Sequence, residues 1–155
     1  VVDSPVGALT IVASDAGVRA VLWPDDDPSR VRLPDSLDDP SHPVIAAAVA
    51  QLDEYFAGTR TSFDVPLDPV GTEFQRAAWD ALRTIPYGVT VSYGDQADRM
   101  GDRRKARAVG AANGRNPISI IVPCHRVVGA NGSLTGFAGG VDTKAWLLAH
   151  EQPAP

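Results

Sequence analysis

The sequence is poor in the residues that build disulfides and metal centres. Its 155 residues include one cysteine, Cys124, and three scattered histidines, His42, His125 and His150. A single cysteine excludes an internal disulfide, which is the usual pattern in a reducing compartment. The spacing of these residues matches no common set of metal ligands, so we expect neither a metal nor a cofactor.

Long apolar runs are also missing. The longest, VIAAAVA and ISIIV, are far shorter than the roughly 20 residues that cross a bilayer. No segment typical of a signal peptide opens the sequence. We therefore expect a cytoplasmic protein without a membrane partner. Hydrophobic residues make up 44%, which is enough for a core, and the length suits one domain or two small ones.

Positive charge is scarce overall but concentrated in one segment. The net charge is −5, yet residues 92–126 carry seven Arg or Lys and three Asp, a local net charge of +4. Local basic patches, rather than total charge, attract phosphates. Charge alone still favours a solvated basic helix face, so a nucleic-acid partner needs other evidence.

The fold class predicted from the pattern is α+β, and its first part, residues 1–69, is predicted to be a structural subdomain. Two β-rich segments, 8–14 and 18–23, flank the turn residues Asp15-Ala16-Gly17. This arrangement predicts a small antiparallel sheet. The boundary with the second part is expected near Pro69-Val70-Gly71.

Three further segments complete the N-terminal part. The Pro- and Asp-rich stretch 24–43 predicts an exposed loop. Apolar residues at helical spacing then predict a helix from Pro43 to Gly58. Residues 61–68 are predicted to be an edge strand, because Pro66 cannot donate a hydrogen bond to a ladder.

Residues 70–155 are predicted to form a mostly helical, winged-helix-like subdomain. Thr72 and Gln75 form a capping box ahead of a helix over 73–85. Residues 118–122, ISIIV, are predicted to be a short buried strand that leads to Cys124.

A helix-turn-helix is predicted inside the basic segment. Ser92 can cap a short helix over 93–100 that Gly101 ends, and Asp102 can cap a second helix over 103–113. Two helices joined by a tight glycine-containing turn are typical of this DNA-binding motif. Many other helical pairs share the pattern, so the motif alone is weak evidence.

Cys124 lies beside His125, and Glu151 follows on a later helix. A thiol needs a base or a positive field to become the reactive thiolate. Taken singly, however, a lone cysteine is usually inert, the histidine fits a hydrogen-bonded loop residue, and the glutamate fits an exposed carboxylate. In an extended chain the histidine would point away from the thiol. A bridging water or a bend at Pro123 would then have to connect them.

Taken together, three segments resemble the O6-alkylguanine-DNA alkyltransferase family. They are RAVGAANGRNP, NPISIIVPCHRVVG and KAWLLAHE, and the similarity runs from residue 79 to residue 151. The first half resembles the family more loosely, through DSPVG and the order of helix and strand. The resemblance implies a monomeric DNA-repair protein that acts on double-stranded DNA. Its reaction would be irreversible, stoichiometric transfer of an alkyl group from O6-alkylguanine, with O4-alkylthymine as a second candidate substrate.

The resemblance also implies roles for individual residues. Cys124 would accept the alkyl group, His125 would take the thiol proton through a water, and Glu151 would orient the imidazole. Tyr93 would donate a proton or hydrogen bond to the guanine, and Asn116 would brace the recognition helix against the active-site loop. The core aromatic and helix-ending roles remain open for Tyr93 and Asn116.

The family's remaining positions concern the flipped base and the DNA. The implied substrate-binding residues are Val127, Phe137, Ala138, Gly139 and Lys144. The implied DNA-binding residues are Tyr93, Gly94, Arg107, Ala108, Gly110 and Ala130. Arg107 would fill the gap that the flipped nucleotide leaves, although a phosphate contact is an alternative. Lys144 could equally be a surface lysine.

One loop departs from the family pattern. Phe137 stands where many members have Tyr, and Ala138 stands where some have Ser. Phe137 keeps an aromatic wall but lacks a hydroxyl that could bond the base. We predict slower transfer or an altered substrate preference.

Three other functions fit parts of the sequence. A protein of similar fold could recognise alkylated DNA without reacting, although relatives of that kind replace the cysteine. A helix-turn-helix regulator could keep Cys124 as a structural residue. A Cys–His hydrolase would need an oxyanion hole and would turn over repeatedly.

Overall fold

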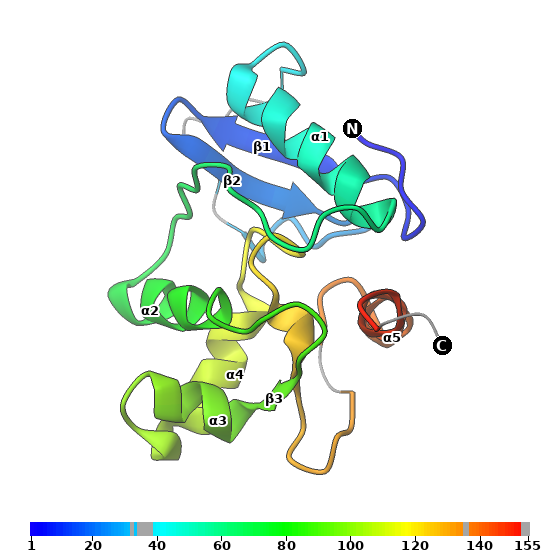
Figure 1. Cartoon of the computed structure of the whole chain (residues 1–155). Helices are drawn as coiled ribbons and strands as arrows, with labels where there is room; N and C mark the ends of the chain where they lie inside the picture. Colours follow the sequence, from blue (N-terminus) through cyan, green and yellow to red (C-terminus); the bar gives the residue numbers. More distant parts are fainter. Residues whose placement is uncertain (32, 34–38, 135–136, 153–155) are drawn as a thin grey trace. The chain divides into compact units, whose positions relative to one another are not determined.

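The computed structural model describes residues 1–31, 33, 39–134 and 137–152, and they form two compact units (Figure 1). Unit 1 comprises residues 1–70 together with 117–121. Unit 2 comprises residues 71–116 together with 122–155. Residues 117–121 therefore belong to unit 1, although the chain on both sides of them belongs to unit 2.

Unit 1 is an antiparallel hairpin covered by one helix. Strand β1 (Thr10–Ser14) pairs with β2 (Gly17–Leu22), with Thr10 opposite Leu22, and helix α1 (Pro43–Phe56) packs against both strands (Figure 1). The helix turns Ile45, Leu52 and other apolar residues of regular spacing into the core, where they are at most 3% exposed. The predicted small sheet with a helix is confirmed.

The ends of α1 follow from its local sequence. Pro43 occupies the first turn, where its missing N–H would have no helical partner. The His42 ring accepts a hydrogen bond from the Val44 backbone at 3.2 Å and so caps the helix. Gly58, at φ +82°, ends it in a conformation that favours glycine.

Residues 61–68 are not the edge strand that was predicted. Within the described segment, Leu67 forms only an isolated parallel bridge with Val18. The Pro66 carbonyl accepts from the Val18 backbone at 2.9 Å, but a proline has no N–H with which to extend the ladder. The approach is close, because a Cβ on Gly17 would lie 2.7 Å from the Pro66 backbone.

Residues 118–122 are buried as predicted, but they do not form a strand. Ile118 forms an isolated bridge with Val21, and the Val21 N–H donates to the Pro117 carbonyl at 2.9 Å. Ile120 has φ 73°, a left-handed conformation that is costly for a β-branched residue and that breaks the extended path.

The loop 24–43 is exposed over most of the residues that the structure describes. Arg30 and Asp26 are an exception, since their side chains are only 11% and 7% exposed and form an ion pair at 2.7 Å. Residues 32 and 34–38 lie outside the described residues, so the prediction of an exposed loop is not extended to them.

Unit 2 is mostly helical. Its elements are α2 (Glu73–Leu82), β3 (Val91–Ser92), α3 (Tyr93–Arg99), the 3-10 turn η1 (Arg103–Lys105), α4 (Ala106–Gly114), the 3-10 turn η2 (Cys124–Arg126), β4 (Val127–Val128) and α5 (Val141–His150). Strands β3 and β4 pair in parallel. The predicted capping box at Thr72 is present, and the predicted cap at Ser92 is also a capping box, with Asp95.

The helix-turn-helix consists of α3 and α4. Gly101, at φ +103°, makes the turn, and the Asp102 side chain accepts from the Arg104 backbone at 3.0 Å. The helix predicted over 103–113 begins as the 3-10 turn η1 and becomes α-helical only at Ala106. The helix predicted over 73–85 ends at Leu82, because the approach of Pro86 disfavours helical geometry.

Buried polar contacts hold the helices of unit 2 together. The Trp79 indole donates to the Ala112 carbonyl at 2.9 Å, which ties α2 to α4. The side-chain amides of Gln96 and Asn113 exchange two hydrogen bonds, at 3.0 and 2.7 Å, which tie α3 to α4. The position of α4 is therefore fixed by specific bonds as well as by apolar packing.

Candidate active site

Cys124 opens the 3-10 turn η2 and is 8% exposed. Its backbone N–H donates to the Val122 carbonyl at 2.9 Å, and the Arg126 N–H donates to the Pro123 carbonyl at 3.0 Å. The chain therefore bends after Pro123 and is not extended at the cysteine. Of the two ways in which Cys124 and His125 could be connected, the bend is present.

His125 is fully buried and is held by Glu151, the residue that ends α5. The distance from His125 Nε2 to Glu151 Oε2 is 2.6 Å, and Glu151 is 2% exposed. The other ring nitrogen, His125 Nδ1, has no hydrogen-bond partner among the described residues. The expectation of an exposed carboxylate at Glu151, when it is considered alone, is therefore wrong.

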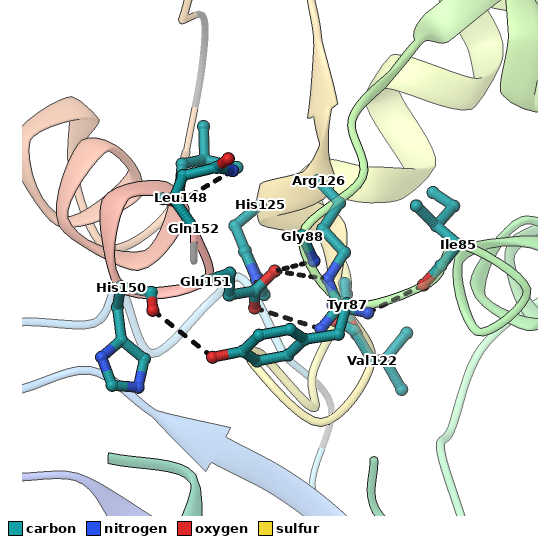
Figure 2. A network of polar contacts seen from close by, with 11 residues as sticks. Ile85, Tyr87, Gly88, Val122, His125, Arg126, Leu148, His150, Glu151 and Gln152 are labelled. Atoms are coloured by element: carbon teal, nitrogen blue, oxygen red, sulfur yellow. Dashed lines mark hydrogen bonds and ion pairs between the residues drawn. The ribbon is translucent and has the colours of Figure 1, made fainter. Parts of the chain in front are cut away.

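Glu151 has a second partner, the guanidinium of Arg126 (Figure 2). Arg126 Nε donates to Glu151 Oε1 at 2.8 Å, and Arg126 Nη2 donates to Oε2 at 3.1 Å. Its Nη1 donates to the Ile85 carbonyl at 2.8 Å, and the Gly88 N–H reaches Glu151 Oε1 at 3.3 Å. Both carboxylate oxygens thus accept hydrogen bonds from two directions.

Arg126 is a site residue that the sequence does not single out, because there it is only one charge of the basic segment. The side chain is 6% exposed, and its charge is directed at a buried carboxylate rather than at solvent. The one available signal was its place directly after the Cys-His pair. Position alone does not distinguish a buried arginine from an exposed one.

Burial and the charges around His125 together set its pKa. Burial lowers the pKa of His125, and the Glu151 carboxylate opposes this effect by hydrogen bond and charge. Arg126 and Lys144 add to the lowering. Because the ionised carboxylate can only accept, Nε2 carries the proton of the neutral ring, and Nδ1 presents a lone pair.

Tyr87 contacts both Arg126 and the end of α5. Its hydroxyl donates to the His150 carbonyl at 3.3 Å, and its ring centroid lies 5.7 Å from the Arg126 guanidinium carbon (Figure 2). Burial, followed by the charge of Glu151, raises the pKa of Tyr87, so its hydroxyl stays protonated at neutral pH.

Asn116 lies two residues after the end of α4 and is 1% exposed. Its side-chain amide donates to the Val122 carbonyl at 2.9 Å, two residues before the cysteine. The same carbonyl accepts from the Cys124 N–H. One acceptor therefore links the end of α4 to the turn that carries the thiol.

Lys144 is 1% exposed, which rules out the alternative of a surface lysine. Its Nζ donates to the Val127 carbonyl at 2.6 Å and lies 6.0 Å from the centroid of the Phe137 ring. Burial lowers the pKa of Lys144, and the nearby Cys124 opposes this effect. The structure thus brings Lys144, Val127 and Phe137 together.

The other predicted site residues lie on the surface of unit 2. Arg107 and Ala108 are exposed on α4, and a Cβ on Gly110 would lie 3.6 Å from the Tyr93 ring. Gly94 faces the guanidinium of Arg103. Two loops carry the remaining positions: Ala130 is exposed at a turn, Ala138 is exposed, and Gly139 is half-buried.

The basic segment is partly neutralised by its own acids. Arg103 pairs with Asp98 at 2.7 Å and with Asp95 at 3.2 Å, and Arg104 pairs with Asp102 at 3.1 Å. The Arg107 side chain makes no hydrogen bond or ion pair with any residue that the structure describes. Arg107 is therefore better placed than Arg103 or Arg104 to meet an external anion.

No group of histidine, cysteine, aspartate or glutamate side chains among the described residues could hold a metal ion. No helix in the same part of the chain is long and apolar enough to span a bilayer.

Comparison with known proteins gives matches along both halves of the chain. Residues 1–69 match the family model of the 6-O-methylguanine DNA methyltransferase ribonuclease-like domain, and residues 73–153 match that of the DNA binding domain. A methylated-DNA–protein-cysteine methyltransferase of Mycolicibacterium paratuberculosis is 50% identical over 153 residues, which cover 97% of this chain and 90% of the relative. One of Methanosarcina acetivorans is 47% identical over 149 residues, with coverage of 96% and 94%.

A solved structure is also similar throughout. The crystal structure of Mycobacterium tuberculosis OGT in complex with DNA has a TM-score of 0.84 and 46% identity, and the match covers 97% of this chain and 89% of that chain.

Proposed function

The chain belongs to the 6-O-methylguanine DNA methyltransferase family, and from this we propose that it repairs DNA by transferring an alkyl group from O6-alkylguanine to Cys124. The relatives named as methylated-DNA–protein-cysteine methyltransferases support the reaction. Cys124 is the proposed acceptor because it is the only cysteine in the chain.

The first step is activation of the thiol. A water between Cys124 and His125 Nδ1 would satisfy this otherwise unpartnered nitrogen. The thiol proton then moves through the water to Nδ1, which leaves a thiolate and an imidazolium. Glu151, bonded to Nε2 at 2.6 Å, stabilises the imidazolium and holds its orientation.

The second step is displacement at the alkyl carbon. The thiolate forms a C–S bond as the C–O6 bond breaks, and the electron pair of that bond passes to guanine O6. Tyr93, the first residue of α3, is proposed to donate a proton or hydrogen bond so that the base leaves uncharged. The thioether has no easy route back to a thiol, so each molecule reacts once.

The substrate must first leave the helical stack, since guanine O6 is shielded inside a duplex. Flipping the nucleotide costs a few kcal/mol. Arg107, exposed on α4 and without a partner among the described residues, is proposed to fill the gap. The small residues Ala108 and Gly110 allow the α4 backbone to come close to the minor groove.

The flipped base is proposed to lie against Phe137 and the carbonyls of Cys124 and Val127. Lys144 donates to the Val127 carbonyl at 2.6 Å and so fixes the direction of that acceptor. The carbonyl keeps a second lone pair for the exocyclic amine of guanine. Backbone N–H groups of Ala138 and Gly139 would donate to O6. Gly94 and Ala130 are proposed to flank the DNA.

One observation carries the proposal. The only cysteine adjoins a buried histidine that is oriented by a glutamate from the far end of the sequence and that has a free lone pair on Nδ1. All three side chains come from one chain, which supports a monomer as the active form. The cytoplasmic location stays a prediction.

A transfer assay tests the proposal. Duplex DNA with O6-methylguanine, labelled in the methyl group, should transfer one label per protein molecule, and Cys124→Ala should accept none. An unlabelled duplex with ordinary guanine serves as the control. Because it carries no alkyl group, prior incubation with it should not use up the thiol, and the labelled duplex should still react. Repeated turnover would indicate a hydrolase, and binding without transfer would indicate a reader of alkylated DNA.

A further inference from the structure

We propose that Arg126 is a positioning residue for thiol activation, because its guanidinium clamps the Glu151 carboxylate so that His125 rests as the neutral ring with its proton on Nε2. The proposal deepens the proposed function and rests on it for the transfer reaction. Its effect on the imidazole can be measured without DNA.

The clamp is geometrically specific. Two N–H groups of Arg126 meet different oxygens of Glu151, at 2.8 and 3.1 Å, while a third donates to the Ile85 carbonyl at 2.8 Å (Figure 2). A planar fork on a carboxylate fixes the plane of both groups. With the Gly88 N–H also bonded to Oε1 at 3.3 Å, rotation of the carboxylate would break several bonds at once.

The fixed carboxylate determines which His125 nitrogen carries the proton. The Oε2 atom lies 2.6 Å from Nε2 and is ionised beside the guanidinium, so it can only accept. A neutral His125 must therefore place its proton on Nε2. The lone pair of the ring is then on Nδ1, the nitrogen that has no partner among the described residues and that is available as a base.

The clamp also cancels the charge of the carboxylate. Arg126 and Glu151 together carry no net charge, so a neutral His125 leaves the buried cluster neutral. A second proton on His125 would place an uncompensated positive charge in a site where all three side chains are at most 6% exposed. Arg126 therefore disfavours the imidazolium before the reaction begins.

The other ionisable groups near His125 do not replace this effect. Glu151 favours the imidazolium, and Lys144 disfavours it from α5. Cys124 is neutral until it loses its proton, and Tyr87 stays protonated because its pKa is raised. Of these groups, only Arg126 both opposes protonation and is bonded to the carboxylate that binds the ring.

A purely structural role for Arg126 would have different consequences. The side chain also joins the end of α5 to the segment 85–88, through Glu151 and the Ile85 carbonyl. If bracing were its only role, its loss would lower stability and would reduce transfer by the same factor at every pH. Loss of the charge, in contrast, should change the titration of one imidazole.

The test uses the whole protein and two substitutions. Arg126→Gln removes the charge and the bond to the Ile85 carbonyl but keeps one N–H group near the position of Nε. Arg126→Lys keeps the charge but loses the fork. Arg76→Gln removes an exposed arginine of α2 and serves as the control. Nitrogen-15 NMR of the imidazole follows the tautomer and titration of His125, which is assigned with a His125→Gln sample.

We expect the pKa of His125 to rise by about one unit or more in Arg126→Gln, to rise by less in Arg126→Lys, and to stay unchanged in Arg76→Gln. The acid limb of the single-turnover transfer rate should move to higher pH in the same order. On that acid limb, transfer should fall about tenfold in Arg126→Gln for each unit by which the pKa rises, and it should recover at pH values above the shifted limb.

An unchanged tautomer and titration in folded Arg126→Gln would overturn the proposal. If that variant does not fold, Arg126→Lys decides: a rise in the His125 titration supports the proposal, and a wild-type titration with a pH-independent loss of transfer refutes it. If the ordered NMR shifts appear but wild-type protein transfers no alkyl group, then the clamp stands and the proposed function fails. If wild-type protein transfers the alkyl group but the NMR shifts do not appear, then the proposed function stands and the clamp is refuted.

Discussion

The two units bury different kinds of side chain. The buried polar residues of unit 1 are Ser14, Gln51 and Ser119, all uncharged, and the rest of its described core is apolar. Unit 2 buries a larger and more strongly polar set, namely Gln96, Asn113, Asn116, His125, Arg126, Lys144 and Glu151.

Burying a polar or charged group lowers stability unless partners compensate it. Unit 1 therefore has the composition of a structural core, whereas unit 2 carries groups that a core alone does not need. Unit 1 also holds one nearly buried ion pair, Arg30 with Asp26, so a cluster of several buried ionisable groups, rather than the amount of charge, marks the candidate site. The exposed acids of unit 1 are more numerous, but they make no comparable cluster in the described residues.

The most direct test of this comparison lowers the stability of each unit by a similar amount. Glu151→Leu in unit 2 leaves His125 and Arg126 without their shared partner and should cost about 3–5 kcal/mol of stability. Leu52→Ala in unit 1 leaves a cavity and should cost about 2–5 kcal/mol. Chemical denaturation measures both changes.

The two variants should then differ in reaction rate. The folded fraction of Glu151→Leu should transfer methyl groups at least roughly a hundredfold more slowly, because general-base assistance is lost. Folded Leu52→Ala should react at the wild-type rate. Equal rates in the two variants would show that the buried cluster is as structural as the apolar core.

Alkylation itself should destabilise unit 2. An added alkyl group on Cys124 forces extra volume into a site where the thiol is only 8% exposed, at a cost of about 1–3 kcal/mol. Thermal melts of free and methylated protein should therefore show a lower midpoint after reaction. A midpoint that stays the same or rises contradicts this expectation.

Stability should fall in mild acid because of His125. Burial lowers the pKa of His125 in the folded state, so below about pH 6.5 the unfolded chain binds a proton that the folded chain does not. The free energy of unfolding should then drop by at most about 1.4 kcal/mol per pH unit below that value, down to the folded pKa.

Denaturation between pH 7 and pH 5 of wild-type protein and of His125→Gln isolates this contribution. The substitution should flatten the pH dependence, since its side chain does not titrate. Parallel curves for the two proteins would mean that the pKa of His125 is the same in the folded and the unfolded chain.

The departure at Phe137 should have a smaller effect. A Phe137→Tyr variant regains a hydroxyl that could bond the flipped base, and one hydrogen bond contributes about 0.5–1.5 kcal/mol. Transfer from O6-methylguanine DNA should become a few-fold faster, as measured by single-turnover kinetics. If Phe137→Tyr reacts no faster than wild-type protein, then the missing hydroxyl at position 137 does not slow transfer.

The smallest expected effect is a difference in the salt dependence of DNA affinity between an arginine variant of unit 2 and one of unit 1. DNA affinity should fall steeply with salt, and Arg107→Gln should reduce the slope of log affinity against log salt by about 0.9 if Arg107 neutralises a phosphate. Arg60→Gln in unit 1 should leave the slope unchanged. A flat response in wild-type protein would contradict the basic segment as the DNA-binding face.

Local signals in the sequence were reliable guides to local structure. The capping box at Thr72 and the helix cap at Ser92 are confirmed, because each needs only groups three residues apart. The hairpin of β1 and β2 is confirmed for a similar reason. Bonds within a few residues do not depend on how the rest of the chain folds.

Predictions that depended on distant partners were less reliable. Residues 61–68 and 118–122 have strand-like composition, yet each makes only isolated bridges within the described chain. A strand requires a neighbour over several residues, and the backbone of Ile120 turns away after two. The composition of a segment indicates its preference for the extended conformation, but it does not indicate how long a neighbouring strand is available for pairing.

Sequence alone determined the family and the likeness of Cys124, His125 and Glu151 to its reacting residues. Tertiary structure decided that Arg126 is a buried partner of Glu151 rather than a surface charge, and that Lys144 bonds the Val127 carbonyl. The physical reason is that burial and contact across 25 residues or 17 residues arise only when the chain folds. Residue type specifies which charge is available, whereas the fold specifies what that charge faces.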